Sequence, residues 1–488
     1  MAKTTNFLAF DLGAESGRAM LGQFDGGRLA LTEVHRFANV PVRLPDGLHW
    51  DVLRLWHEIQ RGLAQARQQA EPAGIGLDTW GVDFALLDRQ GGLLGNPFHY
   101  RDGRSDNMLD EAFRRAGKQA IFDHTGIQFM SINTLYQLLS LVVAESPALA
   151  MAHTFLTIPD LFNYWLTGRK VSEFTIATTT QCYDPLRGDW ATSLLAQVGI
   201  PAHIFPDIVP PGTVLGSLRS EWGPPVSVIA PACHDTGSAV AAVPATGDKF
   251  AWISSGTWSI MGAEVERAVI NGRSLSANMT NEGGVNGTFR FSRNIMGLWL
   301  VQECRRAWAQ QGRDYTYETL TNMAAATAPL QAIIDPDDAD FLKPGDMPAR
   351  IQAYCLRTGQ AVPESRGAIV RCALESLALK YRWVLAQLEA ILGYRLDPIH
   401  IIGGGTQNTL LNRFTADAMG RQVIAGPVEA ASVGNVLVQA MALGHIGSLT
   451  EGRALVGRSF AVEVYEPVGD RAVWDEGYGR LLKLLEDE

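Results

Sequence analysis

The chain has 488 residues, which is enough for two large domains or three smaller ones. Hydrophobic residues make up 47% and charged residues 19%, and this composition excludes an intrinsically disordered protein. The net charge of −10 argues against broad binding to nucleic acid, and no apolar run reaches the length of about 18 residues that a membrane span needs. We therefore expect no nucleic-acid partner and no membrane partner.

The cysteine content indicates a reducing compartment. Five cysteines are scattered along the chain without a C-x-x-C pair, which argues against a zinc ribbon or a disulfide framework. We expect buried free thiols, with Cys355 and Cys372 able to pair only if the fold brings them together. The apolar run Phe7–Phe10 is too short for the core of a signal peptide. These features predict a cytoplasmic protein.

The chain begins with a pattern of strands and turns. Phe7–Phe10 predicts a strand, and Asp11–Gly17 is a glycine-containing turn directly after it. Ala19–Phe24 predicts a second strand, Asp25–Gly27 is a hairpin signal, and Leu29–Phe37 continues as a third strand. The first segment is therefore predicted to be a three-stranded meander.

Helices dominate the next part of the chain. Apolar residues recur at helical spacing over Asp51–Ala70, which predicts an amphipathic helix. Two short strands follow at 75–79 and 84–87, on either side of a Trp-Gly-Val-Asp break. The pattern is mainly helical over 106–168, and the proline-rich stretch 200–225 is predicted to be a loop.

A second strand and turn begin near the middle of the chain. Phe250–Ile253 is again a run of four apolar residues, and the turn Ser254–Thr257 follows it, 243 positions after Asp11. Asn286-Gly287 is another hairpin turn, and the remaining predicted elements are two helices and a strand that runs into three glycines, at 298–310, 368–392 and 398–402. The pattern predicts an α/β protein with two related domains, residues 1–244 and 245–488, on either side of a cleft. Identity between the halves is negligible, so coincidence is an equal alternative.

Three small-residue turns after apolar runs are candidate phosphate-binding loops: Asp11–Arg18, Ser254–Thr257 and Gly403–Asn408. Glycine lets backbone N–H groups converge on phosphate oxygens, hydroxyl groups add donors, and Arg18 adds positive charge. Asp11 beside the first turn suits Mg²⁺, directly or through water, because Mg²⁺ prefers oxygen ligands. Any one of these turns alone is more typical of an ordinary hairpin or strand–helix connection.

The common nucleotide and hydrolase signatures are absent. Gly117-Lys118 is followed by Gln119, so there is no G-x-x-x-x-G-K-[ST] loop, and the Gly403 run does not match G-x-G-x-x-G. Neither H-E-x-x-H nor G-x-S-x-G occurs. These absences argue against P-loop enzymes, dinucleotide enzymes, zinc proteases and α/β-hydrolases.

The segment Ala230–Gly237 contains a candidate general base. Asp235 follows an apolar strand and precedes a predicted small-residue helix over 238–243. One interpretation is a helix N-cap, in which the carboxylate accepts backbone N–H bonds. The other is a base that accepts the proton of a sugar hydroxyl during phosphoryl transfer, and both can hold together. His234 beside it is either a sugar ligand or a packed histidine.

Together these segments resemble the carbohydrate kinases of the FGGY family, within the actin-like ATPase superfamily. The resemblance extends from about residue 6 to 445 in the family's order, and it implies two ribonuclease-H-like domains with ATP and sugar meeting in a central cleft. The motifs that carry it are DLGAESGR (11–18), GLDTWGVDFALLD (76–88), PDLFNYWLTG (159–168), ATTTQ (177–181), HDT (234–236), SSGTWS (254–259), NIMGLWL (294–300), GGGTQNTLLN (403–412) and AGPVEAASVGN (425–435).

The same resemblance implies roles for individual residues. Asp235 matches the catalytic base, and Asp11 matches the position that organises Mg²⁺. The positions that match sugar ligands are Gly81, His234, Asp235, Thr236 and Asn294. Those that match the ATP side are Ala14, Glu15, Ser16, Gly17, Arg18, Thr257, Gln302, Gly404 and Asn408. The role of Glu15 stays open between facing away from ATP and orienting Mg²⁺, since a carboxylate aimed at phosphate is repulsive.

The activity that the resemblance implies is ATP-dependent phosphorylation of a small-molecule sugar. We expect L-rhamnulose as the acceptor and L-rhamnulose 1-phosphate as the product, in L-rhamnose catabolism. The nearest alternative is the same chemistry on another ketose or polyol, such as L-fuculose, D-xylulose or glycerol. An ATP-driven binding protein or a sugar sensor without catalysis is disfavoured by Asp235 and the sugar-facing segments.

Overall fold

The structure is a computed structural model, described here over residues 4–486, and the chain forms two compact units. Neither unit is a single segment of the chain. Unit 1 contains the described residues up to Thr246 together with Glu264–Phe291 and Ala430–Phe460. Unit 2 contains Gly247–Ala263, Ser292–Glu429 and the described residues from Ala461 onward. The domain boundary expected between residues 244 and 245 stays a prediction.

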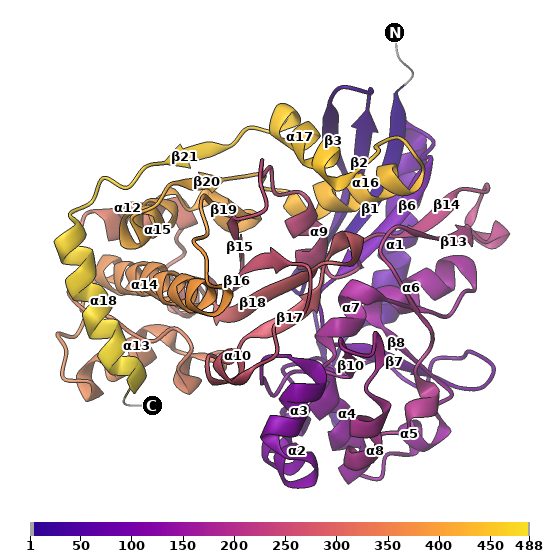
Figure 1. The fold of residues 1–488 in the computed structure, drawn as a ribbon, viewed down its shortest axis with the longest axis horizontal. Coiled ribbons are helices and arrows are strands. Elements are labelled where there is room, and N and C mark those ends of the chain that lie inside the picture. Colours follow the sequence, from indigo (N-terminus) through magenta and orange to yellow (C-terminus); the bar gives the residue numbers. More distant parts are fainter. Residues whose placement is uncertain (1–3, 487–488) are drawn as a thin grey trace. The chain divides into compact units, whose positions relative to one another are not determined.

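Unit 1 is built on a mixed six-stranded sheet of order β13-β14-β6-β1-β2-β3 (Figure 1). The predicted meander is confirmed, because β1, β2 and β3 pair antiparallel, and β6 and β14 extend the sheet parallel to β1. The strands are β1 (Thr5–Leu12), β2 (Ser16–Phe24), β3 (Leu29–Ala38), β6 (Gly74–Thr79), β13 (Thr213–Ser217) and β14 (Ser227–Ala230). The prediction of a loop over 200–225 is wrong at β13, whose register shift between Val214 and Gly216 breaks the alternation that marks a strand.

Helix α1 (Val52–Gln69) covers one face of this sheet and confirms the predicted amphipathic helix. Its buried side includes Leu55, Ile59 and Leu63, at helical spacing. Gly62 allows the helix to lie close to the strands, since a Cβ there would come within 2.8 Å of the Phe10 ring.

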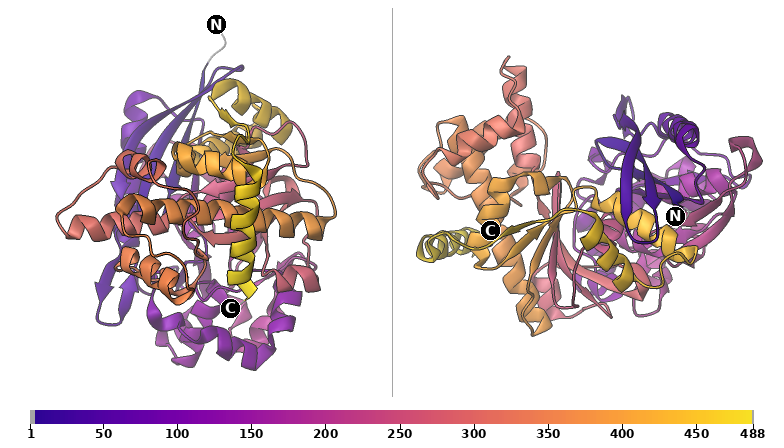
Figure 2. Two further views of the ribbon diagram at one scale, coloured as in Figure 1. Left: turned by 90° about the vertical axis from the view of Figure 1, so that its left-hand side faces the viewer. Right: turned by 90° about the horizontal axis from the view of Figure 1, so that it is seen from above.

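Helix α16 (Ala430–Ala442) lies against the opposite face, although it comes from the last part of the chain. A Cβ at Gly22 would lie 2.7 Å from Val436, and Gln439 donates to the carbonyl of Leu8 at 3.1 Å. Figures 1 and 2 show the yellow helices α16 and α17 (Leu449–Ser459) beside the indigo strands β1 to β3. Leu29 N donates to Ser459 Oγ at 2.9 Å across 430 positions. The sheet of unit 1 is therefore covered on this face by helices from the last part of the sequence.

The remaining elements of unit 1 confirm the mainly helical prediction for 106–168. A second apolar core forms among these helices, around Leu138, Leu139 and Leu194. The helices are α2 (Met108–Ala116), α3 (Lys118–Thr125), α4 (Thr134–Val143), α5 (Pro147–Met151), α6 (Ile158–Thr167), α7 (Phe174–Thr179), α8 (Thr192–Val198), α9 (Asp235–Ala241) and α10 (Gly272–Ser276). The short strands are β4 (Val42–Leu44), β5 (Gly47–His49), β7 (Phe84–Leu87), β8 (Thr154–Thr157), β9 (Ser172–Glu173), β10 (Tyr183–Asp184), β11 (Asp189–Trp190), β12 (Ile208–Val209) and β17 (Thr280–Gly283).

The second sheet has the order β17-β18-β16-β15-β19-β20-β21. β15 pairs antiparallel with β16 and parallel with β19, just as β1 pairs antiparallel with β2 and parallel with β6. Its further strands are β15 (Ala251–Ser255), β16 (Trp258–Val265), β18 (Phe289–Met296), β19 (Ile399–Ile402), β20 (Val423–Ala425) and β21 (Glu463–Tyr465). The two sheets thus share one strand pattern, as the prediction of two related domains requires.

The predicted helices and turn of the second half are confirmed within a residue or two. Asn286 and Gly287 have φ of 60° and 74° between β17 and β18, as the hairpin turn requires. The long α14 crosses the left view of Figure 2 in orange. The helices of unit 2 are α11 (Trp299–Gln310), α12 (Tyr317–Ala325), α13 (Met347–Arg357), α14 (Arg366–Leu392), α15 (Thr409–Met419) and α18 (Arg471–Glu486).

All five cysteines are free and buried, as predicted. A search of the described part of the chain finds no helix with both the length and the apolar character needed to cross a bilayer.

Helix α6 is tied to its surroundings by one buried carboxyl group, that of Asp160. Thr157 and Ser172 donate their hydroxyl groups to Oδ2 at 2.6 and 2.8 Å, and the backbone N–H of Glu173 donates to Oδ1 at 3.1 Å. Burial raises the pKa of Asp160 to about 7, and these hydrogen bonds offset only part of the loss of solvent.

We expect Asp160→Asn to flatten the dependence of the free energy of unfolding on pH between about pH 4 and 7. The unfolded carboxyl group ionises near its ordinary pKa of 3.8, whereas the folded one keeps its proton up to about 7. The contribution of Asp160 is therefore fully present below about pH 4 and is lost as the pH rises, by about 1.4 kcal/mol per unit. Urea unfolding at a series of pH values measures this slope. Asp25→Asn, at an exposed turn, is the control, and equal slopes in wild type and Asp160→Asn would contradict the prediction.

Candidate functional site

The predicted site residues of unit 1 lie at the carboxyl ends of three neighbouring parallel strands. β1 ends at Leu12 before the first glycine turn, β6 ends at Thr79 before Gly81, and β14 ends at Ala230, a few residues before Asp235. Thr79 N donates to the carbonyl of Cys233 at 2.9 Å, so the last two of these loops touch. In open α/β sheets the loops at this edge are where ligands bind. The structure thus brings together the groups that the sequence analysis placed in one site.

Asp11 and Arg18 face each other across the first turn. They are register partners on β1 and β2, and Arg18 Nη2 lies 2.7 Å from Asp11 Oδ2. Ser432 Oγ, from α16, donates to the same oxygen at 3.1 Å. Arg18, expected on the phosphate groups of ATP, therefore neutralises Asp11 in this structure.

The turn between these two residues is narrow. Gly13 N donates to the carbonyl of Ser16 at 2.9 Å, and β2 begins at Ser16 rather than at the predicted Ala19. A Cβ at Gly17 would lie 2.3 Å from the Phe37 ring, so this glycine serves packing. Ala14 and Ser16 are half-buried and Glu15 is exposed.

Gly81 lies in a fixed and strained turn. Val82 has φ of 67°, which is uncommon for a β-branched residue, and its N–H donates to Thr179 Oγ1 at 3.2 Å. A Cβ at Gly81 would lie 3.2 Å from the same Thr179 hydroxyl group. Strained backbone is typical of ligand sites, and it supports a functional role for Gly81.

Asp235 occupies the first turn of α9, close to His234 and Thr236. The helix begins three residues earlier than predicted, so the N-cap position belongs to His234 and the N-cap interpretation of Asp235 is wrong. Asp235 Oδ1 accepts the backbone N–H of Thr236 at 2.5 Å and its hydroxyl group at 3.1 Å, and His234 Nε2 lies 3.4 Å away. Burial raises the pKa of Asp235, and the negative charge of Asp11 adds to that shift.

Asp78 lies beside the candidate site residue Asp11, and the sequence analysis did not single it out. It is fully buried on β6 as the register partner of Asp11, and its Oδ2 accepts from Asn435 Nδ2 at 2.6 Å. Its Oδ1 has no hydrogen-bond partner among residues 4–486. Burial, and then the carboxylate of Asp11, raises the pKa of Asp78 well above its usual range. The available signal was an aspartate inside an otherwise apolar strand.

Two more buried charged residues, Glu282 on β17 and Arg290 on β18, were missed. They contact each other and His234, within unit 1. Their signal in the sequence is weak, because β17 and β18 contain several other polar residues.

The predicted nucleotide residues of unit 2 gather at the corresponding edge of its sheet. Parallel strands β15 and β19 end at Ser255 and Ile402, each directly before a glycine turn. The turns touch, since a Cβ at Gly405 would lie 2.0 Å from Ser255 Oγ. Trp299 N donates to the carbonyl of Thr257 at 3.1 Å and so attaches the start of α11 to the first turn.

The polar groups at this edge suit a nucleotide. Gln302 lies in the first turns of α11, and its buried Oε1 has no hydrogen-bond partner within the described residues. Gly404 is exposed, and Asn408 is the N-cap of α15, accepting from Leu411 N at 3.0 Å. Asn294, expected on the sugar, lies half-buried in the part of β18 that belongs to unit 2, from Ser292 onward.

The carboxylates fit a divalent metal ion that is held mainly by other ligands. Among residues 4–486, no group of three or more His, Cys, Asp or Glu side chains is arranged to hold a metal. Mg²⁺ keeps several waters and binds one or two carboxylates together with substrate phosphates. Asp11 can supply one such carboxylate.

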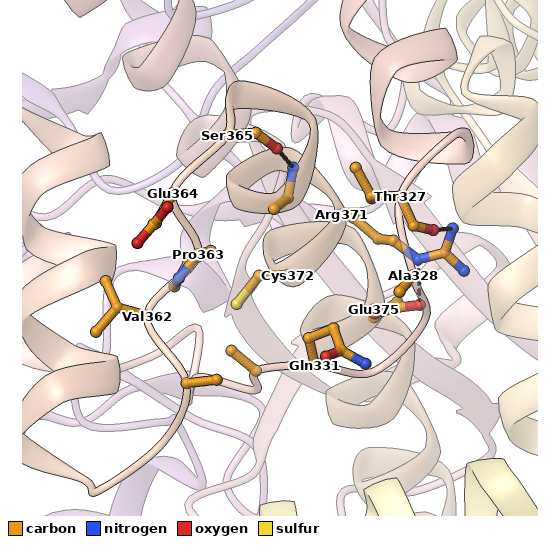
Figure 3. Close-up of a pocket in the computed structure, with 13 residues that line it drawn as sticks. Thr327, Ala328, Gln331, Val362, Pro363, Glu364, Ser365, Arg371, Cys372 and Glu375 are labelled. Carbon is orange, nitrogen blue, oxygen red and sulfur yellow. Dashed lines mark hydrogen bonds and ion pairs between the residues drawn. The ribbon is translucent and has the colours of Figure 1, made fainter.

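The pocket in Figure 3 is a separate feature of unit 2, with a volume of about 400 Å³. It is lined by two loops and by the first turns of α14, and none of its lining residues is a predicted site residue. Arg371 Nε lies 2.7 Å from Glu375 Oε1, and Leu330 N donates to Glu375 Oε2 at 2.8 Å. The charges of Arg371 and Glu375 are thus paired with each other in the wall of the pocket.

Comparison with known proteins identifies the class of this fold and site. The model of the N-terminal domain of the FGGY family of carbohydrate kinases matches residues 6–241, and that of the C-terminal domain matches residues 251–443. The chain belongs to the FGGY family of carbohydrate kinases, which confirms the family expected from the motifs.

Individual relatives are similar over nearly their whole length. The rhamnulokinase of Bacteroides thetaiotaomicron is 44% identical over 479 residues, covering 97% of this chain and 98% of that protein. The rhamnulokinase of Bacillus subtilis is 39% identical over 469 residues, covering 94% and 95%.

Solved structures share the fold at much lower identity. A gluconate kinase from Lactobacillus acidophilus superposes with a TM-score of 0.81 at 16% identity, covering 99% of this chain and 98% of that one. A Plasmodium falciparum glycerol kinase with ADP gives 0.78 at 17% identity, with the same coverage. The expected fold class, α/β with two ribonuclease-H-like domains, is confirmed.

The position of α9, and so of Asp235, depends on one glycine of α16. A Cβ at Gly434 would lie 1.7 Å from the carbonyl oxygen of Ser238, a backbone atom that no rotamer change can move. We expect Gly434→Ala to force the two helices apart, lower the free energy of unfolding by about 1–3 kcal/mol and reduce kcat. Thermal unfolding and steady-state kinetics measure both effects. Gly452→Ala on α17 is the control, because its Cβ would make only ordinary contacts, 3.5 Å from Leu437; equal behaviour of the two variants would refute this account.

Proposed function

We propose that this chain transfers the γ-phosphoryl group of ATP to the terminal hydroxyl group of L-rhamnulose, giving L-rhamnulose 1-phosphate and ADP in L-rhamnose catabolism. The chain is an ATP-dependent sugar kinase of the FGGY family. The acceptor is supported by the rhamnulokinases at 39% and 44% identity over almost the full length of both chains. Xylulose and glycerol kinases share the fold at 21% identity or less, which supports no acceptor.

The observation that carries the chemistry is the setting of Asp235. Phosphoryl transfer needs positioning, charge neutralisation and a carboxylate that accepts the hydroxyl proton. Among the described residues, both Thr236 donors are directed at Oδ1, and His234 Nε2 lies 3.4 Å from the same oxygen, which leaves Oδ2 for the sugar hydroxyl group. A raised pKa makes Asp235 a stronger base once it is ionised, and the proton passes to it as the oxygen attacks phosphorus.

The other residues are assigned to binding. His234, Thr236, Gly81 and Asn294 hold the sugar. The turn Ala14–Arg18 holds the phosphates, where Arg18 can leave Asp11 for a phosphate oxygen. On the nucleotide side the proposed ligands are Thr257, Gln302, Gly404 and Asn408.

We further propose that the divalent ion is Mg²⁺ and that Asp11 holds it, directly or through water. Bound there, the ion neutralises charge on the phosphate oxygens. The proposed compartment is the cytoplasm, where ATP is available and five free thiols stay reduced.

We expect Asp235→Asn to lower kcat by about 10²–10⁴-fold, because the amide keeps the size and an acceptor oxygen but cannot take the proton. Binding of L-rhamnulose, measured by calorimetry, should be mostly kept. The matched control is Asp51→Asn, at the half-buried N-cap of α1, which should leave kcat unchanged. Near-normal turnover in Asp235→Asn would remove this residue from the mechanism.

The acceptor is tested by ADP release with Mg·ATP and a panel of L-rhamnulose, L-fuculose, L-ribulose, D-xylulose and glycerol, beside a reaction without sugar. We expect the highest kcat/KM with L-rhamnulose. Preference for another acceptor would keep the kinase mechanism and change the substrate. Sugar-independent ADP release would instead indicate an ATP-driven binding protein.

A further inference from the structure

A chain of buried polar groups lies behind His234, within unit 1. Arg290 on β18 is completely buried, and Glu282 on β17 is 5% exposed. Arg290 Nη2 lies 2.9 Å from His234 Nδ1 and 3.2 Å from Glu282 Oε2. Arg290 Nε donates to the carbonyl of Gly283 at 2.8 Å, which holds the guanidinium group in place.

The contact between Arg290 and His234 determines which ring nitrogen carries the proton. A guanidinium group only donates hydrogen bonds. At 2.9 Å, Arg290 Nη2 therefore donates to Nδ1, which must be the unprotonated nitrogen of the ring. Glu282 Oε2 is also near Nδ1, but at the longer distance of 3.3 Å, and its negative charge is directed to the guanidinium group. The imidazole proton is thus on Nε2.

The other side of the ring faces the reaction site. His234 Nε2 lies 3.4 Å from Asp235 Oδ1. The backbone of His234 is fixed as well, because its N–H donates to Thr175 Oγ1 at 3.1 Å and the residue bridges to Thr79 on β6. A proton on Nε2 therefore points to the place where the sugar and the base meet.

We infer that Arg290 is a positioning residue that fixes His234 as the Nε2–H tautomer, so that the site presents a hydrogen-bond donor beside Asp235 to an oxygen of the sugar. Glu282 balances the charge of Arg290, which keeps a net positive charge away from the base. The kinetic part of this inference rests on the proposed sugar phosphorylation; the tautomer does not.

The free-energy cost of burying Arg290 and Glu282 favours a functional role for this pair. Burying an arginine–glutamate pair loses the hydration of both ions, and well-packed apolar residues of similar size are often as stable or more so. Burial alone would raise the pKa of Glu282, but the positive charge of Arg290 opposes that shift and the pKa is lowered, so the carboxylate stays ionised. Stability alone therefore gives no reason for two buried ions at this point.

The tautomer is measured by NMR of protein with ¹⁵N-labelled histidine near neutral pH, with His234→Asn used to assign the signals. In wild type we expect His234 Nδ1 to show the shift of an unprotonated nitrogen and Nε2 that of a protonated one. A proton on Nδ1, or on both nitrogens, overturns the inference. This readout does not depend on the acceptor, so failure to phosphorylate L-rhamnulose would overturn the proposed function alone.

The role of Arg290 is tested with the double variant Arg290→Met/Glu282→Leu, which removes the donor without leaving a buried charge unpaired. We expect loss of the fixed tautomer and a rise of about tenfold in KM for L-rhamnulose, with KM for ATP unchanged. Arg290→Lys, which can still donate to Nδ1, should restore much of both properties. A folded double variant with wild-type His234 shifts and wild-type KM would overturn the inference.

The control is Arg371→Met in unit 2, which leaves an equally buried carboxylate, Glu375, without its partner. It should reduce stability while leaving the His234 signals and KM for L-rhamnulose unchanged. An equal rise in KM in this variant would mean that the effect of Arg290 is only structural.

Discussion

Crowding of three carboxylates at one edge of the unit 1 sheet is the constraint on which the rest of that unit depends. Asp11 and Asp78 are register partners on β1 and β6, and Asp235 follows β14. Like charges in buried surroundings repel strongly, and burial together with Asp11 raises the pKa of Asp78 well above its usual range. Helix α16 relieves this repulsion with neutral donors, from Ser432 to Asp11 at 3.1 Å and from Asn435 to Asp78 at 2.6 Å.

The need for these hydrogen bonds to the carboxylates explains why the chain returns to unit 1 near its end. Amide and hydroxyl groups reach the carboxylates only if α16 lies directly on the strands, and glycines make the room. A Cβ at Gly76 would lie 2.3 Å from Asn435 Oδ1, and one at Gly434 would meet the backbone of α9. Several glycines of the motifs are therefore needed for close packing, in addition to any contact with phosphate.

Local features of this architecture could be predicted from the sequence, and long-range ones could not. The meander, α1 and the turn at Asn286 follow from periodicity and turn chemistry within short windows. Two features join residues that are far apart in the chain: the packing of α16 on β1 and the contact of Arg290 with His234. No local sequence pattern encodes either of them. The motif at 76–88 was recognised, yet the importance of Asp78 inside it depends on its register with Asp11 and on burial, which only the fold reveals.

The same three carboxylates support the proposal that Asp235 is the one that accepts a proton. Asp11 is paired with a cation, Arg18, and its side chain is 6% exposed. Asp78 is fully buried and faces an amide. Asp235 has no arginine or lysine within ion-pair distance among the described residues, and its side chain is 30% exposed. A base must reach the substrate and must not be neutralised beforehand by a permanent cation. The tautomer that we infer for His234 meets the second condition too, since it adds a donor beside Asp235 without adding a charge.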